Sequence, residues 1–321
     1  MKSLTAVLLG ISVTYSALAA DSAVFPEKPV TMVVPFAAGG SVDPVARIIA
    51  QRMGELWQQP VVILNRPGAG GNIGAEAVVR ATADGYTLLI GSTALAISPA
   101  IYPKLTYEAG KDLAAISQMV VTPNVLVVHP SLPAKDVKAI LALAKSAPGR
   151  LRSASAGTGS SNHLALVLFN MTGGLNIAHI PYKGAAPAVA DVVGGHVDMT
   201  FVPIPAALPL LKANRLRALG VTTARRSSVI SEVPTIAEAG LPGYEAASWV
   251  GMLAPAATPR AIIDRLNLTV SESLRTPNVR EALLKAGAEP VGDSPQQFEL
   301  TLRQEIVKWA QVAKAAGEKL D

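Results

Sequence analysis

Two glycine-rich loops are the segments whose residue types and spacing could do chemistry. The first covers residues 35–43 (PFAAGGSVD) and the second covers residues 155–163 (SAGTGSSNH). Each follows a β-rich run and precedes a helical pattern, where free backbone N–H groups and the helix dipole favour an anion. Glycine also lets the backbone approach a ligand closely. The two loops predict an anion site, and the alternative for each loop alone is a tight turn.

A serine nucleophile is the competing interpretation of the same loops. Ser41 or Ser160 could act with His163 in an exported hydrolase. The stretch that begins at Gly39 (GGSVD) misses the nucleophile-elbow pattern G-x-S-x-G at its last position, which is Asp43. We therefore expect no enzymatic activity and keep the hydrolase as the alternative.

The residue types that commonly bind metals or cofactors, cysteine and histidine, do not form a recognisable site in this sequence. The chain has no cysteine, which excludes disulfides, thiol nucleophiles, iron–sulfur clusters and thiolate zinc sites. The four histidines are scattered, with no i, i+4 pair beside an acidic residue, so no metal is expected. We expect His129, His179 and His196 to be surface or structural residues, whereas His163 either lines a cleft or caps a helix.

A third glycine-rich segment, residues 65–74 (NRPGAGGNIG), does not have the G-x-G-x-x-G spacing of a dinucleotide site. We read it as a loop and a helix start, and no cofactor is expected.

The elements around these loops predict two α/β lobes. Strands alternate with helices, a pattern that produces parallel sheets covered by helices on both faces. In the first series we expect strands at 30–35, 60–64 and 86–90 and helices at 43–57 and 73–80. In the second we expect strands at 124–129, 151–155, 177–180 and 196–202 and helices at 134–146, 160–171 and 185–193.

The C-terminal part is expected to be helical, at 260–273, 278–286 and 295–316, with Thr258-Pro259 and Ser294-Pro295 as helix starts. Two extended apolar stretches, 118–128 and 248–254, are the candidates for crossings between the lobes. The predicted lobes are residues 21–122 with 252–321, and residues 123–251. Ligands of such sheets bind outside the carboxyl ends of the strands, so both glycine loops are expected to face one cleft.

Residues 1–20 have the pattern of a secretory signal, with an apolar run at 4–13 and small residues at 16–20. We expect cleavage after Ala19 or Ala20 and a periplasmic protein. The 28 Lys and Arg residues are spread along the chain, without the basic stripes of a nucleic-acid surface, so nucleic acid is not an expected partner.

The motifs taken together resemble the Bug family, the receptors of tripartite tricarboxylate transporters. The matching stretches are FPEKPVTMVVPFAAGGSVDPVAR, NRPGAGGNIGAEAV, SAGTGSSNHLAL, HIPYKGAAPAV, GGHVDMTF and SWVGMLAPAATP. The resemblance implies a type II periplasmic binding protein fold that closes on a small carboxylate. It implies ligand contacts, often through water, from Phe36, Ala38, Gly39, Gly40, Ser41 and Asp43 in the first loop, from Ala156, Gly157, Thr158, Gly159, Ser160 and His163 in the second, and from Ser92 and Thr93.

The leading hypothesis is thus a monomeric receptor that delivers a carboxylate to a membrane transporter. A receptor that presents its ligand to a sensor protein is a further alternative. We expect Asp43 to cap a helix by accepting from the N–H of residue 45 or 46 and to meet the ligand through a water. Arg47 is expected to be a surface or lobe-bridging charge.

Overall fold

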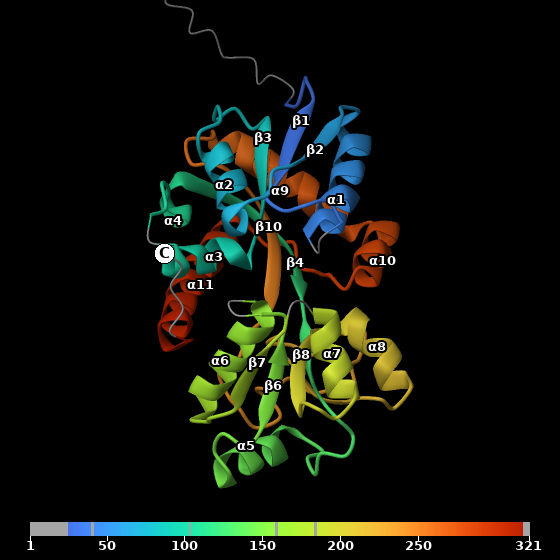
Figure 1. The fold of residues 1–321 in the computed structure, drawn as a ribbon. Helices are drawn as coiled ribbons and strands as arrows, with labels where there is room; N and C mark the ends of the chain where they lie inside the picture. The colour runs from blue at the N-terminus through green and yellow to red at the C-terminus, as the bar shows by residue number, and fades with distance from the viewer. Residues whose placement is uncertain (1–24, 40–41, 103, 158–159, 183–184, 317–321) are drawn as a thin grey trace, which may run out of the picture.

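Two β-sheets, one above the other, divide the chain into two lobes (Figure 1). The computed structural model describes residues 25–39, 42–102, 104–157, 160–182 and 185–316. The signal sequence expected at residues 1–20 lies outside these ranges. No helix within them is long and apolar enough to cross a membrane.

The sheet of the first lobe has six strands in the order β11-β4-β10-β3-β1-β2. β1 is parallel to β2 and β3, as the alternation of strands and helices predicts, whereas β10 is antiparallel to β3 and β4. The sheet is therefore mixed, because β10 runs back from the second lobe. The strands are β1 (Val30–Val34), β2 (Val61–Asn65), β3 (Thr87–Ser92), β4 (Leu113–Thr122), β10 (Ser248–Pro255) and β11 (Glu289–Pro290).

The sheet of the second lobe has five strands in the order β7-β6-β8-β5-β9. β6 is parallel to β7 and β8, and β5 is antiparallel to β8 and β9. The strands are β5 (Asn124–Val128), β6 (Arg152–Ser155), β7 (Ala178–Pro181), β8 (Met199–Pro203) and β9 (Arg217–Val221).

The chain crosses between the lobes at two adjacent places. Only Pro123 separates β4 in the first sheet from β5 in the second, and the return leads into β10. β10 pairs with β4 from its first residue, Ser248, which lies opposite Thr122. The first crossing, at Pro123, falls within the predicted stretch 118–128, whereas the second is complete where the predicted stretch 248–254 begins, because Ala246 still donates to Thr222 in the second lobe and Ser248 already pairs with Thr122.

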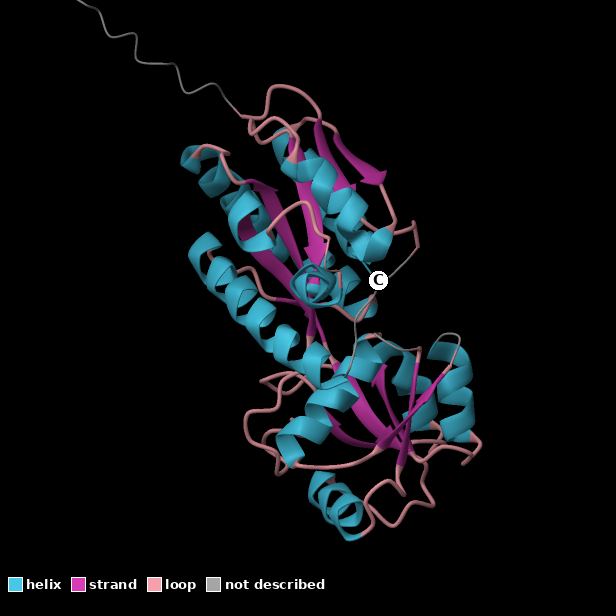
Figure 2. Ribbon diagram, turned by 60° about the vertical axis from the view of Figure 1, so that its left-hand side comes forward, coloured by secondary structure: helices cyan, strands magenta, loops and turns pink. Residues whose placement is uncertain are grey.

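Helices cover both faces of each sheet, as Figure 2 shows. The first lobe carries α1 (Val42–Trp57), the short 3-10 turn Ala69–Gly71, α2 (Asn72–Val79), α3 (Thr93–Ile101) and α4 (Ala109–Asp112), followed after β10 by α9 (Arg260–Arg275), α10 (Pro277–Lys285) and α11 (Pro295–Ala316). The second lobe carries α5 (Val137–Ser146), α6 (Ser161–Gly173), α7 (Ala185–Val193) and α8 (Ile204–Lys212).

Among the described residues, the hydrophobic core is continuous between the lobes on one side only. One buried cluster joins Phe298 and Trp309 of α11 to Phe169 of α6 and to Tyr244. Gly251 in β10 lets α11 lie close to the sheet, because a Cβ there would lie 2.2 Å from the ring of Phe298. Two further clusters are separate, one beneath α1, α9 and α10 and the other beneath α7 and α8. The α11 side is thus fused by apolar packing.

Several elements were not expected from the sequence, namely α3, the short helix α4, α8, β9 and the two-residue strand β11. α3 and α8 contain prolines, which are normally read as helix breakers. Pro205 lies in the first turn of α8, where a missing N–H costs nothing, and Pro99 lies near the end of α3. β9 contains Gly220, which weakens a strand pattern.

One of the two predicted proline-type helix starts has a different geometry. Ser294 caps α11, because its Oγ accepts the N–H of Gln297 at 3.2 Å. Thr258 does not cap α9. Its hydroxyl instead donates to the carbonyl of Pro255 at 2.7 Å, so it ends the preceding turn.

Candidate functional site

A cavity of about 370 Å³ lies between the two lobes, beside the crossings. Hydroxyl, amide and aromatic groups line it, and none of the described lining residues carries a charged side chain. These residues are Phe36, Val42, Ser92, Thr93, Ala94, Ile97, Thr122, Asn124, Ser161, Pro203, Ala246, Ser248, Trp249, Val250 and Trp309.

Four helices begin at this cavity, two from each lobe. Val42 and Thr93 are the first residues of α1 and α3, Ser161 is the first residue of α6, and Pro203 directly precedes α8. The first N–H groups of a helix have no partner within it, and the helix dipole adds partial positive charge there. In α8 the N–H of Ile204 already donates to the carbonyl of Pro123 and Pro205 has no N–H, so this helix contributes mainly through its dipole. Both ends of the cavity therefore favour an anion without any cationic side chain.

The first glycine loop is held by Asp43, but in a way that differs from the expectation. Its carboxylate does not accept from residue 45 or 46. Instead, Oδ2 accepts the backbone N–H of Gly39 at 3.1 Å and Arg47 Nε at 2.8 Å. Oδ1 accepts Arg47 Nη2 at 3.1 Å and Asn65 Nδ2 at 2.9 Å. The carboxylate points back to the loop because α1 already begins at Val42, which leaves Asp43 inside the helix.

Arg47 is an exposed surface residue, as one of the two expectations had it, and it does not bridge the lobes, because its guanidinium pairs with Asp43 and with Asn65 Oδ1 in the first lobe. The hydrogen bonds from Arg47 are the main cause that lowers the pKa of Asp43 to about 2, against the opposing effect of burial. Asn65 also donates to the carbonyl of Phe36 at 3.0 Å. The network thus fixes the backbone of the loop at Phe36 and Gly39.

Ser92 and Thr93 lie in the cavity at the start of α3. Ser92 Oγ caps the helix by accepting the N–H of Ala94 at 3.4 Å. Thr93 Oγ1 accepts the backbone N–H of Trp249 at 2.8 Å, which ties the helix to the crossing strand β10. The hydroxyl hydrogen of Thr93 remains for another acceptor.

The second glycine loop is braced by two serines. Ser160 caps α6: its Oγ accepts the N–H of His163 at 3.4 Å and donates to the carbonyl of Gly157 at 2.6 Å. Ser155 Oγ accepts the N–H of Gly157 at 3.1 Å and lies 2.6 Å from His179 Nε2. A hydroxyl used in this way is a structural cap rather than a nucleophile.

His163 and His179 stack beneath this loop, with ring centroids 3.8 Å apart. His163 is buried, and it is not among the residues that line the cavity. Burial lowers the pKa of His163, and burial together with the neighbouring His163 ring lowers the pKa of His179 to about 4. Both rings are therefore neutral near pH 7.

Of the residues singled out in the sequence, the structure places Phe36, Ser92 and Thr93 on the cavity wall. Gly40, Ser41, Thr158 and Gly159 lie outside the described residues. A third group belongs to the two loops or to the helix turns that follow them without lining the cavity: Ala38, Gly39, Asp43, Ala156, Gly157, Ser160 and His163.

Sequence reasoning missed most of the remaining wall. Thr122, Asn124, Ser248 and Trp249 lie at the crossings, and the prediction of two crossings beside one cleft was a signal that could have found them. Trp309 comes from the C-terminal helix, for which the sequence carries no such signal.

Two crossings join the two α/β lobes, and helix N-termini surround the cavity between them. This arrangement defines a two-lobe solute-binding receptor. The chain belongs to the TctC family, described as the tripartite tricarboxylate transporter family receptor, whose model matches residues 45–317. This confirms the resemblance and the fold class, and it decides against the hydrolase.

Similar proteins cover almost the whole chain. BugT of Bordetella pertussis is 39% identical over 317 residues, which are 98% of this chain and 97% of BugT. A protein of Pseudomonas sp. strain P51, encoded in the tcbD-tcbE intergenic region, is 41% identical over 307 residues, 94% of this chain and 91% of that one.

Three solved structures are informative. R. palustris Rpa4515 with adipate is 41% identical with a TM-score of 0.74, covering 92% of this chain and 100% of that one. MatC of Rhodopseudomonas palustris with malate is 34% identical with a TM-score of 0.69, covering 90% and 99%. A TctC solute-binding protein from Polaromonas without ligand is 26% identical with a TM-score of 0.83, covering 90% and 99%.

Proposed function

We propose that this receptor binds a small dicarboxylate in the interlobe cavity, with one carboxylate at each end. The observation that carries the proposal is the meeting of four helix N-termini, two from each lobe, at a cavity whose described lining residues bear no charge. Each helix end contributes up to about 2 kcal/mol to an anion in a partly buried site. Apolar groups of Phe36, Ile97 and Trp309 on the wall suit the methylene chain between the carboxylates.

Hydroxyl and amide groups supply the remaining affinity. Ser161 and Asn124 of the second lobe and Thr93 of the first lobe stand on the wall, and hydrogen bonds to an ionised group contribute about 1.5–3 kcal/mol each. Relatives whose solved structures hold adipate and malate support the ligand class.

The ligand-free relative supports closure of the lobes on binding. Its TM-score is higher than those of the two ligand complexes, although its sequence identity is lower. An open arrangement of the two lobes in this chain explains why its TM-score is highest with the ligand-free relative. Closure then excludes water from the cavity and strengthens the contacts to the ligand.

The receptor acts in the periplasm after cleavage behind Ala19 or Ala20 and hands its ligand, as a monomer, to a membrane transporter. The predicted lobes, 21–122 with 252–321 and 123–251, remain part of this proposal. Intact mass of the exported protein checks the cleavage, and retention of Met1 would contradict it. Neighbouring genes for a signalling protein instead of a transporter would favour the sensory alternative.

A thermal-shift panel tests the ligand class. Adipate, succinate and malate are compared with hexanoate and with neutral adipamide. A bound ligand stabilises the fold by RT ln(1 + [L]/Kd), about 2.7 kcal/mol at one hundred times Kd. We expect at least one dicarboxylate to raise the Tm more than hexanoate and adipamide do. Equal stabilisation by adipamide, or none by any carboxylate, would overturn the proposal.

A charge placed in the cavity gives a sharper test. Asn124→Asp replaces the side-chain amide of a buried residue in the cavity wall with a carboxylate. The negative charge should repel a dicarboxylate and weaken its binding tenfold or more. Asn278→Asp, at the exposed start of α10, is the matched control and should leave the affinity unchanged. Tryptophan emission reports binding, because Trp249 and Trp309 line the cavity while Trp57 bonds Thr269 away from it.

A further inference from the structure

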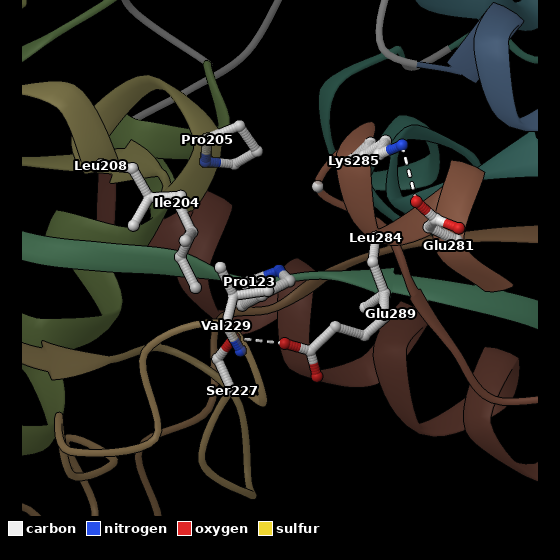
Figure 3. Close-up of a pocket in the computed structure, with 11 residues that line it drawn as sticks. Pro123, Ile204, Pro205, Leu208, Ser227, Val229, Glu281, Leu284, Lys285 and Glu289 are labelled. Carbon is white, nitrogen blue, oxygen red and sulfur yellow. Dashed lines mark hydrogen bonds and ion pairs between the residues drawn. The ribbon is translucent and has the colours of Figure 1, made fainter.

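A second interlobe space lies on the opposite side of the crossing from the ligand cavity. Successive residues of an extended strand point to opposite faces. Thr122 and Asn124 line the ligand cavity, whereas Pro123 between them lines an apolar groove of about 310 Å³. We call this space the rear groove. α8 of the second lobe forms one wall and α10 of the first lobe forms the other (Figure 3).

Two contacts tie the lobes together across the rear groove. The hydroxyl of Ser227, in the second lobe, donates to Glu289 Oε1, in the first lobe (Figure 3). Ser227 is fully buried, and Glu289 is fixed in β11 opposite Val121 of β4. The hydrogen bond therefore joins the two lobes close to the crossing.

The second contact is a close approach of backbone to side chain. Gly287, in the turn after α10, has a φ of +77°, and a Cβ at this position would lie 2.3 Å from Cγ of Pro205 in α8. Only glycine allows the turn to lie this close to the second lobe. Ser227–Glu289 and Gly287–Pro205 are together called the rear latch.

The rear latch contrasts with the α11 side, where one hydrophobic cluster runs through both lobes. The clusters beneath α10 and α8, which flank the rear groove, are separate. A rotation about the crossings that narrows the ligand cavity must widen the rear groove, because the two spaces lie on opposite sides of Pro123. Such a rotation breaks the rear latch but leaves the strand pairing at the crossings intact.

We propose that the rear latch holds the lobes apart on the ligand side and thereby sets the affinity of the receptor, with Ser227, Glu289 and Gly287 as affinity-determining residues that never touch the ligand. The apparent Kd of a two-state receptor is its intrinsic Kd divided by the fraction of binding-competent molecules. Loss of the latch raises the closed fraction and lowers the apparent Kd. The affinity part of this inference rests on the proposed function.

Two variants disrupt the rear latch in opposite ways. Ser227→Ala removes an attraction, and its control is Ser273→Ala, which removes an equally buried hydroxyl that bonds Thr269 within α9. Gly287→Ala adds a methyl group against Pro205. Its control is Gly243→Ala, at a φ of +81° and with nothing within 4 Å of the added methyl group. This variant therefore has the same backbone strain as Gly287→Ala but no steric contact with a neighbouring residue. Glu289→Gln keeps an acceptor for Ser227 and should behave as the wild type, whereas Glu289→Ala should behave as Ser227→Ala.

The first readout needs no ligand. The chain has no cysteine, so spin labels can be placed at Lys212→Cys on α8 and Arg280→Cys on α10, both exposed and on the two helices that form the walls of the rear groove. We expect Ser227→Ala and Gly287→Ala to shift the label distances of the free protein towards longer values, and the two controls to match the wild type. Unchanged distances in both latch variants would overturn the proposal.

The second readout is the Kd for adipate by calorimetry, which we expect to fall about threefold or more in both latch variants and to stay unchanged in both controls. Longer label distances with an unchanged Kd would overturn the latch as an affinity device. If no carboxylate of the panel binds the wild type, the proposed function fails, and the label distances alone decide whether the latch holds the lobes open.

Discussion

Asp43 accepts the backbone N–H of Gly39 at 3.1 Å, so the first turn of α1 holds the loop that precedes it. Asp43 is 4% exposed, and both of its carboxylate oxygens accept hydrogen bonds from protein donors. Its charge is therefore neutralised within the first lobe, which explains how an acidic residue can stand next to a site for anions.

Replacement of Asp43 should destabilise the protein even when the side chain keeps its shape. In Asp43→Asn, whichever side receives the amide NH₂ faces a donor, because Arg47 and Gly39 approach one oxygen while Arg47 and Asn65 approach the other. We expect a loss of about 1.5–3 kcal/mol in urea unfolding. Glu299→Gln, in an exposed i, i+4 pair with Arg303, should cost less than about 0.5 kcal/mol. Equal losses would show that the network does not hold the loop.

The same residue predicts part of the acid stability. The pKa of Asp43 is lowered to about 2 in the folded protein, below its value in the unfolded chain. Its contribution is therefore complete above about pH 4 and is lost as the pH falls towards 2. The difference in unfolding free energy between wild type and Asp43→Asn should shrink over that interval.

The stacked histidines predict a second pH effect, at higher pH. The pKa of His179 is lowered to about 4 because burial and His163 disfavour the charged ring, so the unfolded chain binds more protons between pH 6.5 and 4. The Tm should fall as the pH decreases through this interval. His179→Phe keeps an aromatic ring and removes the titration, so its Tm should change less. His196→Gln, at an exposed position, serves as the control. An equally steep decrease in the Phe variant would contradict this account.

Asp293 predicts an effect of the opposite sign. Burial raises its pKa to about 6, even though its carboxylate accepts the N–H of Gln118 at 2.7 Å. A raised pKa means that the charged form is unfavourable in the fold, so stability is lost as the pH rises from about 4 through 6. Asp293→Asn can still accept from Gln118 and should gain about 1 kcal/mol at pH 7, allowing for partial solvent access. Asp264→Asn, on an exposed helix face, should gain nothing.

The fold was largely predictable because its periodic signals are local. The βαβ runs around β1, β2 and β3, and around β6, β7 and β8, alternate strand and helix in the way that parallel sheets require. The direction of β10 was not predictable in this way, because it depends on a return through the second lobe. α3 and α8 were missed because Pro99, Pro205 and Pro209 mask their helical character.

The sequence predicted those residues of the site that belong to one continuous segment, and it missed those that the fold brings together from distant segments. A glycine loop before a helix indicates an anion site by itself, and Phe36, Ser92 and Thr93 do lie at the cavity. Arg47 stands at the i, i+4 spacing from Asp43, but Asn65 comes from 22 positions away, and no local pattern reveals that this residue completes the network. Trp309 reaches the wall only because α11 packs across both lobes.

The position of β10 also bears on the order in which the protein can fold. β10 lies between β3 and β4, so the first sheet lacks an inner strand until residue 255 has been synthesised. By then the whole second lobe has been made. The N-terminal third of the chain therefore has no complete sheet to form while synthesis continues, and pairing of such distant segments is slow. We therefore expect the first lobe to complete its sheet only after the second lobe has been synthesised.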